Sequence, residues 1–171
     1  DTSGNISQAT QVVTLVDTID PVIFAPSDIV AEAISLSGTM VELGGVTAYD
    51  VMGISSVTEH PPRFFVLGET TVTWTATDYS GNSASTTQTV TIVDTISPSI
   101  TAPDSITAEA TSADSNIVVL GSPVSSDLVD TPSISNNAPD VFPVGETTVT
   151  WTATDYSGNS ASTTQTVTIV D

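Results

Sequence analysis

Aspartate-led glycine turns recur at a fixed spacing along this sequence. DYSGN occupies residues 78–82 and returns unchanged at residues 155–159, 77 positions later, and a degenerate copy, DTSGN, occupies residues 1–5. Carboxylate, amide and carbonyl oxygens in such turns are ligands for Ca²⁺, which takes roughly six to eight oxygens at about 2.3–2.6 Å. The same aspartates could instead cap their own turns by accepting backbone hydrogen bonds. The residue types alone leave both interpretations open.

The charge balance is strongly acidic. Twenty Asp and Glu residues face one arginine, one histidine and no lysine, which gives a formal net charge of −19. Binding to the phosphates of nucleic acids needs clustered Lys and Arg and is excluded. Docking on an anionic membrane is disfavoured, and no apolar run approaches the roughly 20 residues of a membrane span. With no cysteine there is no disulfide or thiolate metal site, and without a set of paired catalytic groups we expect no enzyme.

The chain consists of a 77-residue repeat. Residues 68–94 recur without change at residues 145–171, and the segments upstream stay in register without a gap. We therefore expect two full domains, residues 18–94 and residues 95–171. The leader, residues 1–17, matches only the last 17 residues of a repeat. It is either the last-strand tail of a preceding repeat or a strand donated to another subunit.

Apolar and polar residues alternate in a way that predicts strands throughout. In TTVTWTATD, Val72, Trp74 and Ala76 alternate with threonines, and SASTTQTVTIVD alternates in the same way. Shorter strands are predicted at Val22–Phe24, Ile29–Ala33, Met40–Leu43 with Val46–Tyr49, and Ile54–Thr58, and no segment has helical periodicity. About seven short strands in each repeat predict an all-β fold of tandem immunoglobulin-like antiparallel β-sandwiches, with Trp74 and Trp151 in the cores.

These segments resemble a known family. The combination of DTIDP, AEA, FPVGETTVTWTATD and SGN is similar to the hyalin repeat, or HYR domain, over residues 18–171, with the tail of a third copy in residues 1–17. The resemblance implies an immunoglobulin-like sandwich, often in tandem, in extracellular and cell-surface proteins associated with adhesion. Many animal members carry a cysteine pair that this chain lacks. On that ground we expect a prokaryotic surface protein.

Arranged as such a sandwich, the acidic residues collect in the loops at the two ends of each domain. We expect a metal site at the central junction, with a second at the upstream junction, and Ca²⁺ as the ion, because Mg²⁺ demands a tighter octahedron and Zn²⁺ prefers His and Cys. The predicted ligands at the central junction are Glu32, Glu69, Asp94, Asp127, Asp130, Asp155 and Asn159. The predicted ligands at the upstream junction are Asp17, Asp50 and Asp78.

Two functions are compatible with these features. The first is a structural repeat segment of an extracellular fibre, pilus-like filament or adhesin stalk, with calcium stiffening the junctions and neighbouring repeats or identical subunits as partners. The second is a ligand-binding cell-adhesion module that recognises a surface ligand or glycan. Its specificity would lie in the divergent half of each repeat, residues 21–67 and 98–144.

Overall fold

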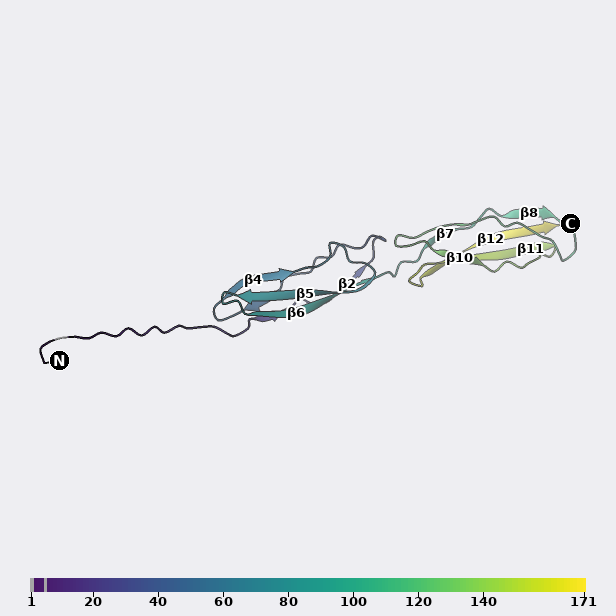
Figure 1. Ribbon diagram of the computed structural model, residues 1–171. Helices are drawn as coiled ribbons and strands as arrows, with labels where there is room; N and C mark the ends of the chain where they lie inside the picture. Colours follow the sequence, from purple (N-terminus) through teal and green to yellow (C-terminus); the bar gives the residue numbers. More distant parts are fainter. Residues whose placement is uncertain (1, 5) are drawn as a thin grey trace. The chain divides into compact units, whose positions relative to one another are not determined.

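The computed structural model describes residues 2–4 and 6–171, and every regular element in that part of the chain is a strand (Figure 1). No helix there could cross a membrane. The strands of the first repeat are β1 (Val22–Phe24), β2 (Ile29–Glu32), β3 (Thr47–Tyr49), β4 (Ile54–Glu59), β5 (Gly68–Asp78) and β6 (Ser83–Val93). Those of the second are β7 (Ser99–Thr101), β8 (Ile106–Glu109), β9 (Val124–Ser126), β10 (Ser133–Asn136), β11 (Gly145–Thr154) and β12 (Ser160–Val170).

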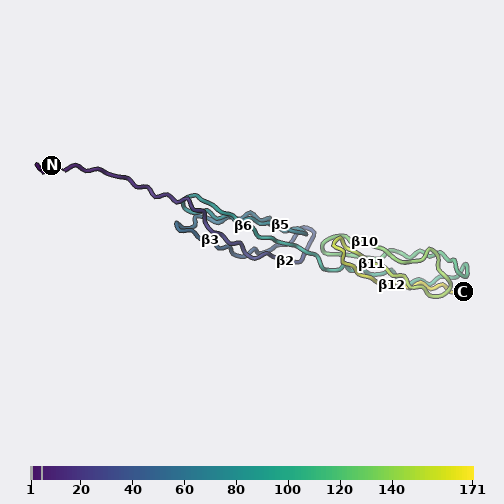
Figure 2. The backbone as a smooth tube through the Cα atoms, turned by 90° about the horizontal axis from the view of Figure 1, so that it is seen from below, coloured from purple at the N-terminus to yellow at the C-terminus, as the bar shows by residue number. Residues whose placement is uncertain are grey.

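The strands of each repeat form one four-stranded and one two-stranded sheet. The four-stranded sheets have the orders β2-β6-β5-β4 and β8-β12-β11-β10, and the two-stranded sheets are β1-β3 and β7-β9. The last strand of each repeat pairs in parallel with the second strand. In the second repeat, β10, β11 and β12 lie side by side in both views (Figures 1 and 2). The predicted all-β sandwich fold is confirmed.

The described residues group by their contacts into two compact units. The first unit contains residues up to Ser27 together with 43–61 and 71–88, and the second contains residues 28–42, 62–70 and 89–171. The division therefore falls inside the ranges of β5 and β6 and not between the two repeats. The domain boundaries at residues 18–94 and 95–171 stay a prediction.

The cores are built from the alternating face of the two long strands. Val149, Trp151 and Ala153 of β11 are buried, as are Val167 and Ile169 of β12, while the threonines between them remain accessible. These side chains pack with Phe142 and with half-buried apolar residues of β7 and β8. The two tryptophans that the alternation placed in the core, Trp74 and Trp151, are both buried.

A buried glutamine joins the last strand to the loops opposite it. Gln165 Nε2 donates to the carbonyls of Asp104 and Leu120, at 2.8 Å each, and its Oε1 accepts from Trp151 Nε1 at 3.2 Å. Gln88 in the first repeat makes the corresponding bonds to the carbonyls of Ser27 and Leu43, at 2.7 and 3.0 Å. Because an unpaired buried amide would be costly, this residue fixes both loops on the strand.

The predicted strand at Met40–Leu43 is absent from the described structure. Only an isolated bridge, Thr39 to Phe65, forms near it, and Asn116 and Phe142 repeat that bridge in the second repeat. The physical reason lies at Leu43, whose carbonyl accepts from the Gln88 side chain and not from a neighbouring strand. Each repeat therefore has six named strands among the described residues, where about seven were expected.

The leader carries a strand sequence but no strand pairing. In the described residues 6–17 no strand is formed, and Val13 and Leu15 are 73% and 93% exposed. Their counterparts 154 residues later, Val167 and Ile169, are buried in the second core. The same apolar side chains are thus buried in β12 and exposed to solvent in the leader.

Candidate metal centres

Three aspartates of the first unit come together at the point where the chain enters the first repeat. Asp17 precedes β1, Asp50 directly follows β3, and Asp78 is the last residue of β5. One carboxylate oxygen from each lies within 4.8 Å of the others. We call this set the first-unit site. Among the described residues, it is the group of acids whose carboxylate oxygens lie this close together. It brings together all three residues predicted for the upstream junction.

Asp78 is held in place by its own turn. Its Oδ1 accepts from the backbone N–H groups of Ser80 and Asn82 at 2.8 and 2.9 Å, and its Oδ2 accepts from Asn82 Nδ2 at 2.8 Å. Burial acts to raise the pKa of Asp78, but the hydrogen bonds from the side chain of Asn82 and from the backbone of residues 80–82 outweigh it and lower the pKa below its ordinary value. The carboxylate is therefore ionised at neutral pH.

Asp17 and Asp50 each use one oxygen locally and leave the other for another partner. Asp17 Oδ1 accepts from Ile19 N at 3.1 Å, and Asp50 Oδ1 accepts from Met52 N at 2.7 Å. Asp17 Oδ2 is buried and has no hydrogen-bond partner. A buried carboxylate oxygen without a partner is costly, and no basic side chain accompanies the three acids. An all-oxygen set of this charge fits Ca²⁺ and does not provide the nitrogen or sulfur ligands typical of Zn²⁺.

The asparagine of the turn ties the linker to the repeat. Asn82 Nδ2 donates to the carbonyl of Asp17 at 3.3 Å as well as to Asp78. Asn159 makes the same bonds one repeat later, to the carbonyl of Asp94 at 3.1 Å and to Asp155 Oδ2 at 2.9 Å. The asparagine of each of these two SGN turns therefore holds both the turn aspartate and the carbonyl of the aspartate before the linker threonine. We call this arrangement the aspartate frame.

The second unit contains the corresponding residues and one additional acid. Asp94, Asp127 and Asp155 follow the first-unit residues by 77 positions, and we call them, with Asp130, the second-unit site. No three of these described residues bring carboxylate oxygens within the 4.8 Å that the first-unit site meets, so the structure does not gather the ligands predicted for the central junction as closely. Asp94 Oδ1 accepts from Ile96 N at 3.2 Å, and its Oδ2 accepts from Ser157 Oγ at 3.1 Å. Asp94 and Asp155 are both buried. The bond from Ser157 was not anticipated, although a serine stands at this position in every copy of the turn.

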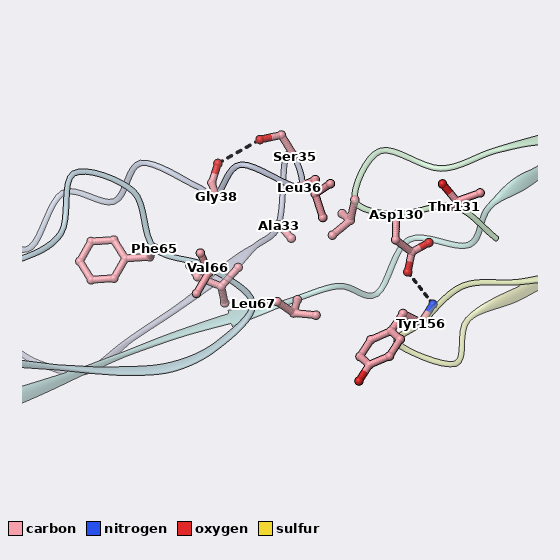
Figure 3. Close-up of a pocket in the computed structure, with 12 residues that line it drawn as sticks. Ala33, Ser35, Leu36, Gly38, Phe65, Val66, Leu67, Asp130, Thr131 and Tyr156 are labelled. Carbon is pink, nitrogen blue, oxygen red and sulfur yellow. Dashed lines mark hydrogen bonds between the residues drawn. The ribbon is translucent and has the colours of Figure 1, made fainter.

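Asp130 is the main difference between the two sites. Its Oδ2 accepts from Tyr156 N at 2.6 Å, as Figure 3 shows, and its Oδ1 is buried without a hydrogen-bond partner. The matching position in the first repeat is Gly53, whose backbone carbonyl accepts from Tyr79 N at 3.3 Å. A side-chain carboxylate thus replaces a carbonyl as the acceptor, and it adds a charge. Asp130 also borders an open apolar pocket of about 440 Å³ within the second unit (Figure 3).

The two predicted glutamate ligands have different surroundings. Glu32 accepts from Thr95 through both carboxylate oxygens, from the backbone N at 2.6 Å and from Oγ1 at 2.9 Å. Glu32 thus contacts the linker directly after Asp94. Glu69 is exposed near the start of β5. A role for either glutamate in binding an ion stays a prediction.

The HYR domain family matches residues 16–92 and 93–169. Hyalin from Strongylocentrotus purpuratus is 38% identical over the whole chain, and hyalin from Lytechinus variegatus is 37% identical over the whole chain. The chain spans 16% and 35% of these two relatives. A sushi, von Willebrand factor type A, EGF and pentraxin domain-containing protein from Rattus norvegicus is 35% identical over 93% of the chain, which spans 5% of it.

Solved structures with a similar trace include human protocadherin-24 EC1-2, with a TM-score of 0.43 and 11% identity, covering 90% of this chain and 100% of that one. Mouse cadherin-23 EC22-24 gives a TM-score of 0.40 and 15% identity, covering 91% of this chain and 66% of that one.

The fold and the two family matches define a tandem of extracellular, adhesion-related repeat modules. The chain belongs to the HYR domain family, as the residues predicted. This family is in general non-enzymatic. The relatives named here come from sea urchins and a rodent, so they give no support to the prokaryotic origin that the missing cysteines suggested.

Proposed function

We propose that this chain is a structural repeat segment of an extracellular fibre, pilus-like filament or adhesin stalk, in which Ca²⁺ fixes each linker to the repeat that follows it. The observation that carries this function is the first-unit site, where three carboxylate oxygens approach within 4.8 Å and Asp17 Oδ2 is buried without a partner. Residues 68–94 and 145–171 are identical, which supports a segment made of equivalent units.

Asp17, Asp50 and Asp78 would hold the ion in the first unit, and Asp94, Asp127, Asp130 and Asp155 would hold it in the second. Bound Ca²⁺ would offset the repulsion among carboxylates that have no basic partner. The chain's own groups prepare these positions. The turn hydrogen bonds hold the Asp78 and Asp155 carboxylates in a fixed orientation, and the Asn82 and Asn159 amides hold the linker carbonyls. Fixing the linker in this way would limit bending of the chain at each repeat.

Calorimetric titration of the full chain with Ca²⁺ tests this function. We expect saturable binding at the two sites, with loss of one site in Asp17→Asn. Asp114→Asn is the matched control, since Asp114 is exposed and lies outside both sites. Absence of saturable binding at millimolar calcium would reject the metal-stiffened segment.

A second function, the ligand-binding adhesion module, is favoured by a separate observation. The divergent half of the first repeat exposes a stacked aromatic pair, Phe24 and Tyr49, whose counterparts in the second repeat are Thr101 and Ser126. A difference confined to one repeat is expected of a recognition surface and is not needed in a uniform stalk.

A further inference from the structure

The two-stranded sheet of the first repeat presents an aromatic platform on its outer face. β1 and β3 pair with Val22 opposite Tyr49 and Phe24 opposite Thr47, so these four side chains share one face. Phe24 and Tyr49 are diagonal neighbours, and their ring centroids lie 6.3 Å apart at an interplanar angle of 28°. Phe24 is 56% exposed and Tyr49 57%, so neither ring belongs to the core.

The second repeat shows that the fold does not need these rings. β7 and β9 pair in the same register, with Ser99 opposite Ser126 and Thr101 opposite Val124. On that face a hydrogen bond between hydroxyl groups joins the two strands, with Ser99 Oγ 2.8 Å from Ser126 Oγ. The same sheet forms with serine and threonine at these positions. The exposed aromatic side chains of the first repeat are therefore not needed to form it.

We propose that Phe24, Tyr49 and Val22 form a binding platform for a neutral saccharide. The two half-exposed rings give an apolar surface against which the C–H face of a sugar ring can pack, and Thr47 adds a hydroxyl on the same face. The four outward positions carry no charge. A net charge of −19 repels sulfated or otherwise anionic glycans, so the sugar that fits is uncharged.

The size and shape of the platform exclude the larger occupants. Two half-exposed rings and a valine offer on the order of 250 Å², whereas each partner in a stable protein complex contributes about 800 Å². The surface is the face of a sheet and not a groove, so it lacks the walls that hold an apolar peptide. A second copy of the chain would bring its own negative charge to the contact.

This platform would serve the second function named above, and it can be tested apart from calcium. Titration calorimetry of the full chain would use a neutral β-glucan hexasaccharide, chitohexaose and mannohexaose as probes, with heparin as the anionic probe, each in calcium and in chelator. The main variant is Phe24→Thr with Tyr49→Ser, which installs the residues of the second repeat. Phe64→Ser is the matched control, because it removes an exposed aromatic ring outside the platform.

We expect at least one neutral oligosaccharide to bind and heparin not to bind. Affinity should fall about tenfold or more in the double variant and stay unchanged in the control. Adding Thr101→Phe with Ser126→Tyr to the double variant should restore binding, which also shows that the loss was not a folding defect. The site is rejected if no neutral probe binds at millimolar concentration, if the double variant binds equally well, or if sedimentation shows that the rings control self-association instead. None of these outcomes alters the calcium titration.

Discussion

The two linker–turn sites share an aspartate frame and differ in the partner of the linker aspartate and in one acceptor beside the turn. Asp94 Oδ2 accepts from Ser157 Oγ, whereas Asp17 Oδ2 has no hydrogen-bond partner. In both, the turn aspartate accepts from the turn asparagine, and that asparagine also holds the carbonyl of the linker aspartate. In the first unit, Gly53 supplies a carbonyl to Tyr79 N, and in the second unit Asp130 supplies a carboxylate to Tyr156 N. The frame is therefore set by the repeated SGN turn, while the charge of each site is set by the divergent half of the repeat.

Removing the turn aspartate should have the largest effect on the frame. Asp155→Ala leaves the Asn159 backbone N–H without its acceptor and removes one of the two acceptors of Asn159 Nδ2. An unsatisfied donor of this kind costs about 1–3 kcal/mol. We expect a loss of about 2 kcal/mol in the free energy of unfolding, measured by urea denaturation in chelator so that no metal contributes. Asp114→Ala should change little. Equal stability of both variants would mean that the turn bonds do not hold the frame.

Removing the extra charge should distinguish the two sites. Asp130→Asn keeps an oxygen for Tyr156 N but takes one negative charge from the second-unit site. Because ligand charge tunes calcium affinity, we expect about tenfold weaker binding at that site and no change at the first-unit site. Titration calorimetry of the full chain measures both. Unchanged affinities would place Asp130 outside the metal shell.

Placing an aspartate at Gly53, the counterpart of Asp130, should destabilise the first repeat because of the backbone conformation there. Gly53 has a φ of +89°, and a Cβ there would lie 3.4 Å from the Tyr79 ring. We expect Gly53→Asp to cost about 1 kcal/mol of stability, since left-handed backbone disfavours side chains. Gly45→Asp is the control, because a Cβ at Gly45 meets no atom within 4 Å. A Gly53→Asp variant as stable as the control would contradict this reason.

The smallest effect concerns pH. The pKa of Asp78 lies below its ordinary value of 3.8, so the ionised carboxylate stabilises the folded state. That contribution is complete above the ordinary pKa and is lost as the pH falls through the lowered, folded-state pKa. In chelator, we expect Asp78→Asn to be less stable than the native chain at pH 7 and the difference to shrink in acid. A difference that grows in acid would contradict the lowered pKa.

Much of the fold follows from the sequence because its signals are local. The alternation of Val72, Trp74 and Ala76 with threonines places the buried face of β5 correctly, and the exact repeat carries that result to β11. The false strand at Met40–Leu43 has apolar residues at suitable spacing, but its backbone is bound by Gln88, which is 45 residues away. A long-range side-chain bond of this kind leaves no trace in local periodicity.

The candidate sites show the same division. Asp17, Asp50 and Asp78 could be grouped from sequence because strand alternation places their loops at one end of the sandwich. Two other bonds could not be predicted from sequence. The bond from Ser157 to Asp94 depends on the path of the linker, and the bond from Tyr156 N to Asp130 depends on a carboxylate replacing a backbone carbonyl. Phe24 and Tyr49 were predicted as strand residues, but only pairing of β1 with β3 shows that their rings stack on the outer face.

Thermal unfolding of the full chain in calcium and in excess chelator tests the central claim, that an ion joins the linker aspartate to the turn. The native chain is compared with Asp17→Asn, Asp94→Asn and the double variant. We expect calcium to raise the midpoint by at least about 5 °C, because a ligand at a hundred times its Kd adds about 2.7 kcal/mol. Each single variant should lose part of that rise and the double variant all of it. An unchanged midpoint in the native chain, or a full rise in the double variant, would contradict the claim.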